Sequence, residues 1–76
     1  MSSLPAHMTP EAWLRQAFSS RQALDGGVIR RKVQDVDRIV GRPRFEAYLR
    51  HRGFRAVENA GQYVIFCNRA PVRVIE

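Results

Sequence analysis

The residues best suited to chemistry in this chain are nine cations that fall between Arg30 and Arg55. Only Asp35, Asp37 and Glu46 oppose them, so this window carries a formal charge of 9 − 3 = +6, whereas the rest of the chain balances at 4 − 4 = 0. Eight of the nine are arginine, which keeps its charge at any cellular pH and makes bidentate contacts to phosphate and guanine. A charge localised in this way predicts a polyanionic partner, and nucleic acid is the commonest one.

Catalytic chemistry has little support in the sequence. A nucleophile needs a positioned base, and Cys67 with His51, sixteen residues apart, is the only conceivable pair. Gly26-Gly27 lacks the further residues of a phosphate-binding loop. One cysteine and two histidines fall short of a structural zinc set. We therefore expect no enzyme, no catalytic residue, no cofactor and no metal site.

The length of 76 residues predicts a single domain with a small core. A lone cysteine excludes an internal disulfide. The longest apolar run, Tyr63 to Cys67, is far shorter than the roughly 20 residues of a membrane span. Met1 to Pro10 does not have the pattern of a secretion signal. We expect a cytoplasmic protein with no membrane partner, associated with the nucleoid if it binds DNA.

These cations need a scaffold, and its first element is a helix. Residues 1–8 lack periodicity and are interpreted as a flexible leader. Thr9-Pro10-Glu11 combines a capping side chain, a proline suited to the first helical position and an acid near the positive end of the helix dipole. The helix then either frays at Ser19-Ser20 or runs on to Leu24, and residues 25–27 end it.

Two further helices follow a short strand at Val28 to Arg30. Apolar residues recur every three or four positions from Val33 to Val40, which predicts an amphipathic helix that ends at Gly41. After a tight connection, residues 43–52 form the third predicted helix, which Gly53 closes.

The C-terminal third has the pattern of a β-hairpin. Phe54 to Glu58 and Gln62 to Asn68 are the predicted strands, joined by a three-residue turn, Asn59-Ala60-Gly61. Residues 69–76 are a tail or an edge strand, since Pro71 argues against a central strand. The expected fold is α+β, with three helices, a short strand and a C-terminal β-hairpin over residues 9–68.

This order of elements resembles the winged helix-turn-helix DNA-binding domain. Gly41 falls in the turn between two short helices, Val36 and Val40 precede it at core positions, and Asn59-Ala60-Gly61 lies where the wing tip would be. The chain departs from the family at Asp37, where the family prefers a small residue, and in its third helix of about ten residues, which is short for recognition.

The resemblance implies that helix 43–52 is the recognition helix. Arg44 would contact a base edge, on the side of the helix that also carries Ala47 and His51. The other cations of this region would position the phosphate backbone, and the run from Arg30 to Lys32 would grip a neighbouring phosphate run. The predicted DNA-binding residues are Arg30, Arg31, Lys32, Arg42, Arg44, Arg50, His51, Arg52 and Arg55.

Some of these cations have a competing structural explanation. Arg50 is spaced to pair with Glu46, and Arg38 with Asp35. Tyr48 is expected to be half-buried, and Trp13 and Cys67 to lie in the core. The binding hypothesis requires the remaining arginines to converge on one surface of the folded chain.

The sequence is compatible with two functions. The first is a small DNA-binding protein of the transcriptional-regulator class, possible as a homodimer, with double-stranded DNA as its partner. The alternative is a protein-interaction module that holds an acidic partner or dimerises through strand addition by the tail. RNA is the less favoured ligand, because Tyr63 and Phe66, the aromatics available to stack on bases, are expected on opposite faces of their strand.

Overall fold

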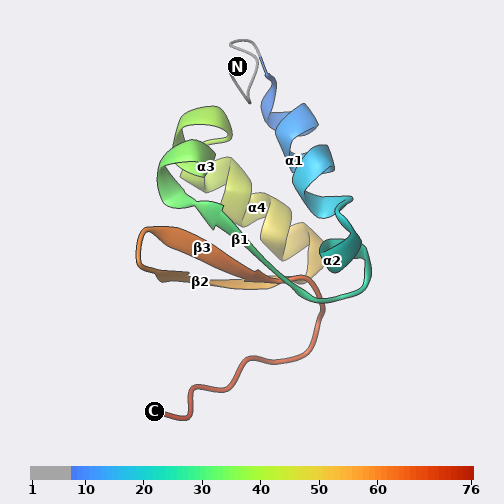
Figure 1. The fold of residues 1–76 in the computed structure, drawn as a ribbon, viewed down its shortest axis with the longest axis vertical. Helices are drawn as coiled ribbons and strands as arrows, with labels where there is room; N and C mark the ends of the chain where they lie inside the picture. The colour runs from blue at the N-terminus through green and yellow to red at the C-terminus, as the bar shows by residue number, and fades with distance from the viewer. Residues whose placement is uncertain (1–7) are drawn as a thin grey trace.

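The computed structural model describes residues 8–76. Residues 1–7, which belong to the predicted leader, lie outside this range. Helices cover one side of a three-stranded sheet, and the C-terminal segment leaves on the other side (Figure 1). The elements in chain order are α1 (Pro10–Phe18), α2 (Arg21–Leu24), β1 (Val28–Lys32), α3 (Val33–Ile39), α4 (Arg42–Arg52), β2 (Arg55–Asn59) and β3 (Gln62–Phe66). The predicted α+β class is confirmed, and the fold is compatible with a small winged-helix-like domain.

The first predicted helix is two helices in the structure. Thr9 caps α1 as predicted, its hydroxyl accepting from the Ala12 amide at 3.0 Å. The chain then leaves the helix at Ser19 and starts again, because the Ser20 hydroxyl accepts from the amide of Ala23 and caps α2. The described residues therefore form four helices where the sequence predicted three, and neither a frayed end nor a continuous helix describes this segment.

The helix pair α3–α4 is closely joined to the sheet. Lys32 ends β1 and Val33 begins α3, with no residue between the two elements. Gly41, at φ +89°, makes the turn into α4, a backbone angle that a residue with a Cβ rarely adopts. Helix α4 begins at Arg42, one residue earlier than predicted, and ends at Gly53 in a left-handed conformation.

The sheet is antiparallel with strand order β1-β3-β2. Its hairpin strands are Arg55–Asn59 and Gln62–Phe66, shifted or shortened relative to the prediction. Asn59 pairs with Gln62, so the loop has two residues, Ala60 at φ 53° and Gly61 at φ 73°. The predicted three-residue turn is therefore wrong: two successive positive φ angles define a type I′ turn, whose twist matches that of the strands.

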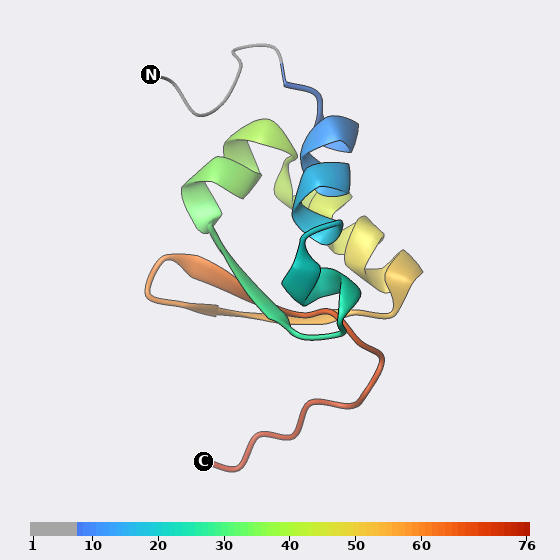
Figure 2. The same cartoon turned by 45° about the vertical axis from the view of Figure 1, so that its right-hand side comes forward.

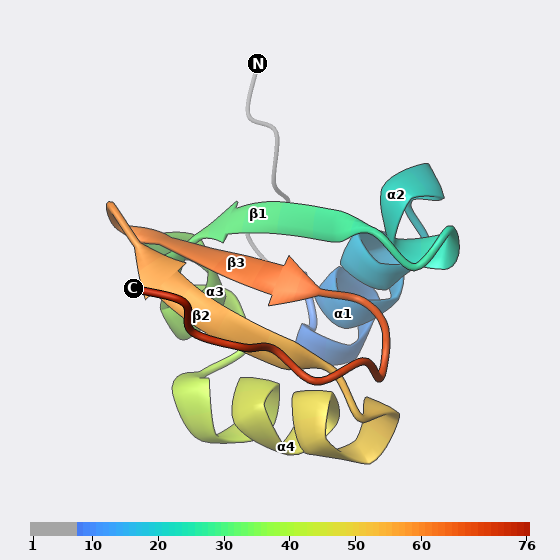
Figure 3. The same cartoon turned by 90° about the horizontal axis from the view of Figure 1, so that it is seen from below.

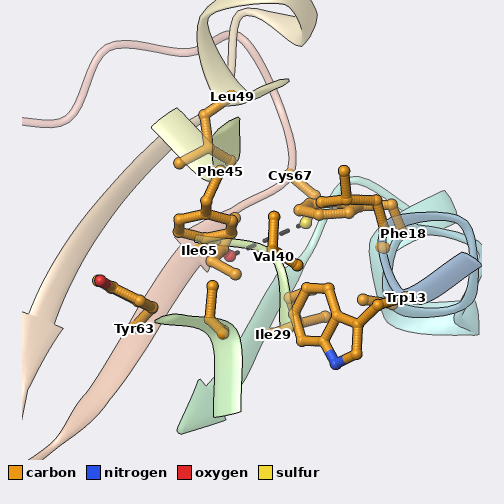
Figure 4. Packing of buried hydrophobic residues seen from close by; sticks show 13 residues of the cluster. Trp13, Phe18, Ile29, Val40, Phe45, Leu49, Tyr63, Ile65 and Cys67 are labelled. Atoms are coloured by element: carbon orange, nitrogen blue, oxygen red, sulfur yellow. Dashed lines mark hydrogen bonds between the residues drawn. The ribbon is translucent and has the colours of Figure 1, made fainter. Parts of the chain in front are cut away.

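The core lies between the helices and the inner face of the sheet, and Figure 4 shows its packing. Phe45 is 1% exposed and its ring centroid lies 4.8 Å from that of Tyr63. The predicted burial of Trp13 and Cys67 is confirmed, and burial raises the pKa of the Cys67 thiol. Tyr48 is half-buried as predicted.

The opposite face of the sheet has no helix against it (Figure 2). We call this the outer face; by strand register it consists of Val28, Arg30, Lys32, Arg55, Val57, Asn59, Gln62, Val64 and Phe66. Residues 69–76 form no strand, and the C-terminal end of the chain runs away from the body on this side. Among the described residues, no helix has the length and apolar character needed to traverse a bilayer.

Candidate nucleic-acid interface

Helix α4 carries five of the nine residues that the sequence predicts to bind DNA. Phe45 and Leu49 anchor it in the core, so its opposite side is turned to solvent. We call Arg44, Ala47, Arg50 and His51, all exposed, the α4 flank. Ala47, at the middle of this flank, has the smallest side chain of the four.

Arg42 is held by two carboxylates. Its Nε donates to the Glu46 carboxylate at 3.1 Å, and its guanidinium lies 4.0 Å from the Glu58 carboxylate on β2. The hydrogen bond that Arg42 donates to Glu46 is the main reason that the pKa of Arg42 is raised. The charge of Arg42 is therefore compensated within the protein.

Arg44, the predicted base-reading residue, is also paired. Its guanidinium donates to the Glu11 carboxylate of α1 at 2.6 Å. Both side chains are more than half exposed, at 53% and 67%. An exposed pair contributes about 0–1 kcal/mol, so a phosphate or base edge can replace the carboxylate at small cost.

The C-terminal end of α4 carries Arg50, His51 and Arg52. Within the described part of the chain, no carboxylate lies within 4 Å of Arg50, His51 or Arg52. Arg52 nevertheless has structural contacts, since it donates to the Tyr48 hydroxyl and lies 4.6 Å from the centroid of the Phe54 ring. Arg50 and His51 are the free members of the α4 flank.

Arg69 belongs to the same end of the molecule, although the sequence did not single it out. Its side chain packs over Gly53, and its Nε donates to the carbonyl of Arg52 at 3.2 Å. It comes from the segment after β3, seventeen residues from its partner. No local spacing could have indicated this contact, because the fold alone brings the two segments together.

The remaining predicted cations lie on the sheet. Arg30 and Lys32 of β1 and Arg55 of β2 belong to the outer face. Arg31 points to the other side of β1, and its guanidinium donates to the carbonyl of Arg30 at 2.7 Å. The sheet residues share their face with no acidic side chain from any strand.

The expected single surface is thus divided into two adjoining parts. Viewed from below, α4 lies beyond β2, on the side away from β1 (Figure 3). The outer face and α4 are therefore neighbours in this view, but β1 and α4 stand at its two edges. The predicted Arg38–Asp35 pair is confirmed at 3.3 Å, whereas the alternative in which Arg50 pairs with Glu46 is not seen, since Glu46 bonds to Arg42.

Asp37, which departs from the family pattern, has a definite role in the fold. Its carboxylate accepts a hydrogen bond from the Tyr63 hydroxyl at 2.8 Å, which joins α3 to the central strand. Burial, reinforced by this hydrogen bond, raises the pKa of Tyr63 to about 12. A small residue at position 37 would leave the tyrosine hydroxyl without this partner.

Comparison of the chain with protein-family models, with curated proteins and with solved structures finds no match. Residues 8–76 contain no group of three or more histidine, cysteine or acidic side chains placed to hold a metal ion. The candidate interface consists of two cation-bearing surfaces on a helix–sheet scaffold.

Proposed function

We propose that the protein binds duplex DNA through the α4 flank, as a small regulator of the winged-helix type that acts on the nucleoid. The observation that carries the proposal is the composition of this flank: Arg44, Arg50 and His51 surround the small Ala47, and the opposite side of the helix is fixed in the core. A rigid helix with cations on its solvent side matches the way in which recognition helices enter the major groove.

Paired and unpaired cations would have different tasks in such a complex. Arg50 has no carboxylate to exchange in the described structure, so its contact with phosphate carries no internal cost. Arg44 would leave Glu11 to reach a base edge, which makes its contribution depend on sequence. Arg55 and Arg42, at the β2 side of the helix, would contact the flanking backbone.

The test is a titration of a labelled DNA duplex at a series of salt concentrations, repeated with duplex RNA. If about four cations engage phosphates, log affinity falls with log salt at a slope near −4. Arg50→Ala should weaken binding roughly fivefold to tenfold on every sequence. Arg44→Ala should weaken a preferred sequence more than a random one.

Arg21→Ala is the matched control. Arg21 of α2 pairs with the C-cap residue Asp25, and α2 and α4 lie at opposite edges of the view in Figure 3. The change in net charge equals that of Arg50→Ala. A salt slope near zero, or equal losses from Arg21→Ala and Arg50→Ala, would refute binding by the α4 flank.

The C-terminal segment favours a second function, association with a protein. Val74 and Ile75 are 87% and 95% exposed, and they follow Val72, which is 41% exposed. Such a run matches a segment that adds to the sheet edge of a partner or a second copy. Truncation after Asn68 should then abolish self-association in analytical ultracentrifugation and leave the circular dichroism spectrum unchanged; unchanged association would exclude this function.

A further inference from the structure

The outer face of the sheet has a composition that neither a solvated surface nor the duplex proposal explains. Strand register arranges its nine residues in three rows across β1, β3 and β2. The rows are Val28–Phe66–Arg55, Arg30–Val64–Val57 and Lys32–Gln62–Asn59. Three cations, one aromatic ring and two amides therefore share a face on which no strand places an acid.

The aromatic ring occupies the middle of the first row. Phe66 is partly exposed on the central strand, and Arg55 lies directly opposite it on β2. Val28 flanks the ring on the other side and is 43% exposed. A planar apolar surface bordered by a guanidinium suits a stacked base whose phosphate is neutralised beside it.

The other two rows also combine cations with apolar or amide side chains. Successive rows are about 7 Å apart, since they are two residues apart in each strand. The middle row holds Arg30, Val64 and Val57. Val64 is buried, and Val57, which is 45% exposed, gives this row an apolar surface with a cation at the other end. Gln62 and Asn59 in the third row offer amide donors and acceptors to base edges, with Lys32 alongside.

We propose that the outer face is a platform for single-stranded nucleic acid, on which about two or three unpaired nucleotides lie across the strands. The positive charge selects a polyanion, and the partly exposed Phe66 selects one whose bases are free to stack. A duplex cannot use this ring, because its bases are stacked on each other. The inference does not rest on the duplex proposal, since it involves a different form of ligand and shares only Arg55 with that surface.

The experiment compares two variants on two ligands. A labelled oligothymidine of about 12 nucleotides and a labelled DNA duplex are each titrated with the full chain by fluorescence anisotropy. Phe66→Leu keeps the apolar volume and removes the ring, so it should weaken single-strand binding roughly fivefold or more and leave duplex affinity unchanged. Arg50→Ala on the α4 flank should leave single-strand affinity within about twofold of wild type.

The results that overturn the inference are distinct from failure of the duplex proposal. Unchanged single-strand affinity in Phe66→Leu, or equal losses in both variants, would mean that no platform exists, whatever the duplex does. Changes in the methyl NMR signals of Val57 and Val64 with protein concentration alone would assign the face to a second copy instead. Should Phe66→Leu fail to fold by circular dichroism, Gln62→Ala in the third row, which has no part in the duplex proposal, decides by the same comparison.

Discussion

The Arg44 guanidinium meets the Glu11 carboxylate at 2.6 Å and so links the first turn of α4 to the first turn of α1. The acid thus holds the one arginine that the winged-helix resemblance assigns to base reading. Because the pair is exposed, it acts less as a source of stability than as a competitor for the guanidinium.

Removing that competitor should strengthen DNA binding. Glu11→Gln frees Arg44, and an exposed pair worth about 0–1 kcal/mol predicts binding to a preferred duplex that is tighter by up to about fivefold. Glu76→Gln makes the same change in net charge in the C-terminal segment and should alter affinity by less. Equal gains from both variants in an anisotropy titration would indicate a general charge effect and would exclude a specific role for the pair.

Tyr63 predicts a loss of stability in alkali. Its pKa in the folded protein is about 12, above the ordinary value of 10, so the folded state holds the phenolic proton more tightly than the unfolded state does. The resulting stabilisation is complete below pH 10 and is lost as pH rises toward 12. Urea unfolding at a series of pH values measures it.

The control for this prediction is Tyr63→Phe, which keeps the ring and removes the proton. It should be about 1 kcal/mol less stable at neutral pH, because the hydrogen bond to Asp37 is lost. Its stability should fall less steeply between pH 10 and 12. Cys67, whose pKa burial also raises, is present in both proteins and cancels from the comparison. Parallel pH profiles would rule out Tyr63 as the source.

The hairpin turn offers a stabilising substitution. Ala60 has φ 53°, a left-handed conformation that costs a residue with a Cβ about 1–2 kcal/mol. Ala60→Gly should therefore stabilise the fold by about 0.5–1 kcal/mol, after the greater chain entropy of glycine is subtracted. Ala47→Gly, in the exposed middle of α4, should destabilise it by about 1 kcal/mol. Thermal melts showing the same sign for both would contradict the type I′ turn.

The core makes a matched prediction about isoleucine. Ile65 is 0% exposed at the centre of the sheet, whereas Ile75 is 95% exposed. Ile65→Val should cost about 0.5–1.5 kcal/mol of unfolding free energy, because it leaves a small cavity in packed surroundings. Ile75→Val removes the same methylene from solvent and should change the stability by less than about 0.5 kcal/mol. Denaturant titration compares the two.

The elements that the sequence predicted well are those fixed by local signals. Thr9 caps α1 by its own side chain, and Gly53 ends α4 in the left-handed conformation that glycine favours. The serines after α1 allowed two outcomes, and the structure has a third, because Ser20 caps a new helix. Ala60 gave no signal for positive φ, since alanine rarely adopts it; pairing of the flanking strands imposes it.

The site was less predictable because its electrostatics depend on partners from other elements. Glu46 is four residues from both Arg42 and Arg50, so spacing alone allows either pair. Glu58 from β2 also approaches Arg42, and this second acid favours the N-terminal choice. Glu11 reaches Arg44 across thirty-three residues in the same way. Which arginines remain free is therefore a property of the folded chain.

The direct passage from β1 into α3 has a mechanical consequence. No hinge separates Lys32 from Val33, and the Val33 amide donates to the carbonyl of Gly61 at 2.9 Å, which clamps the hairpin tip to the same junction. Sheet and helix pair should accordingly tumble with one correlation time in spin relaxation. Under the duplex proposal, a scaffold without a hinge at this junction would leave shape adjustment to the DNA and to side-chain rotamers. Sequences that kink or widen easily would then be preferred even where no base is touched.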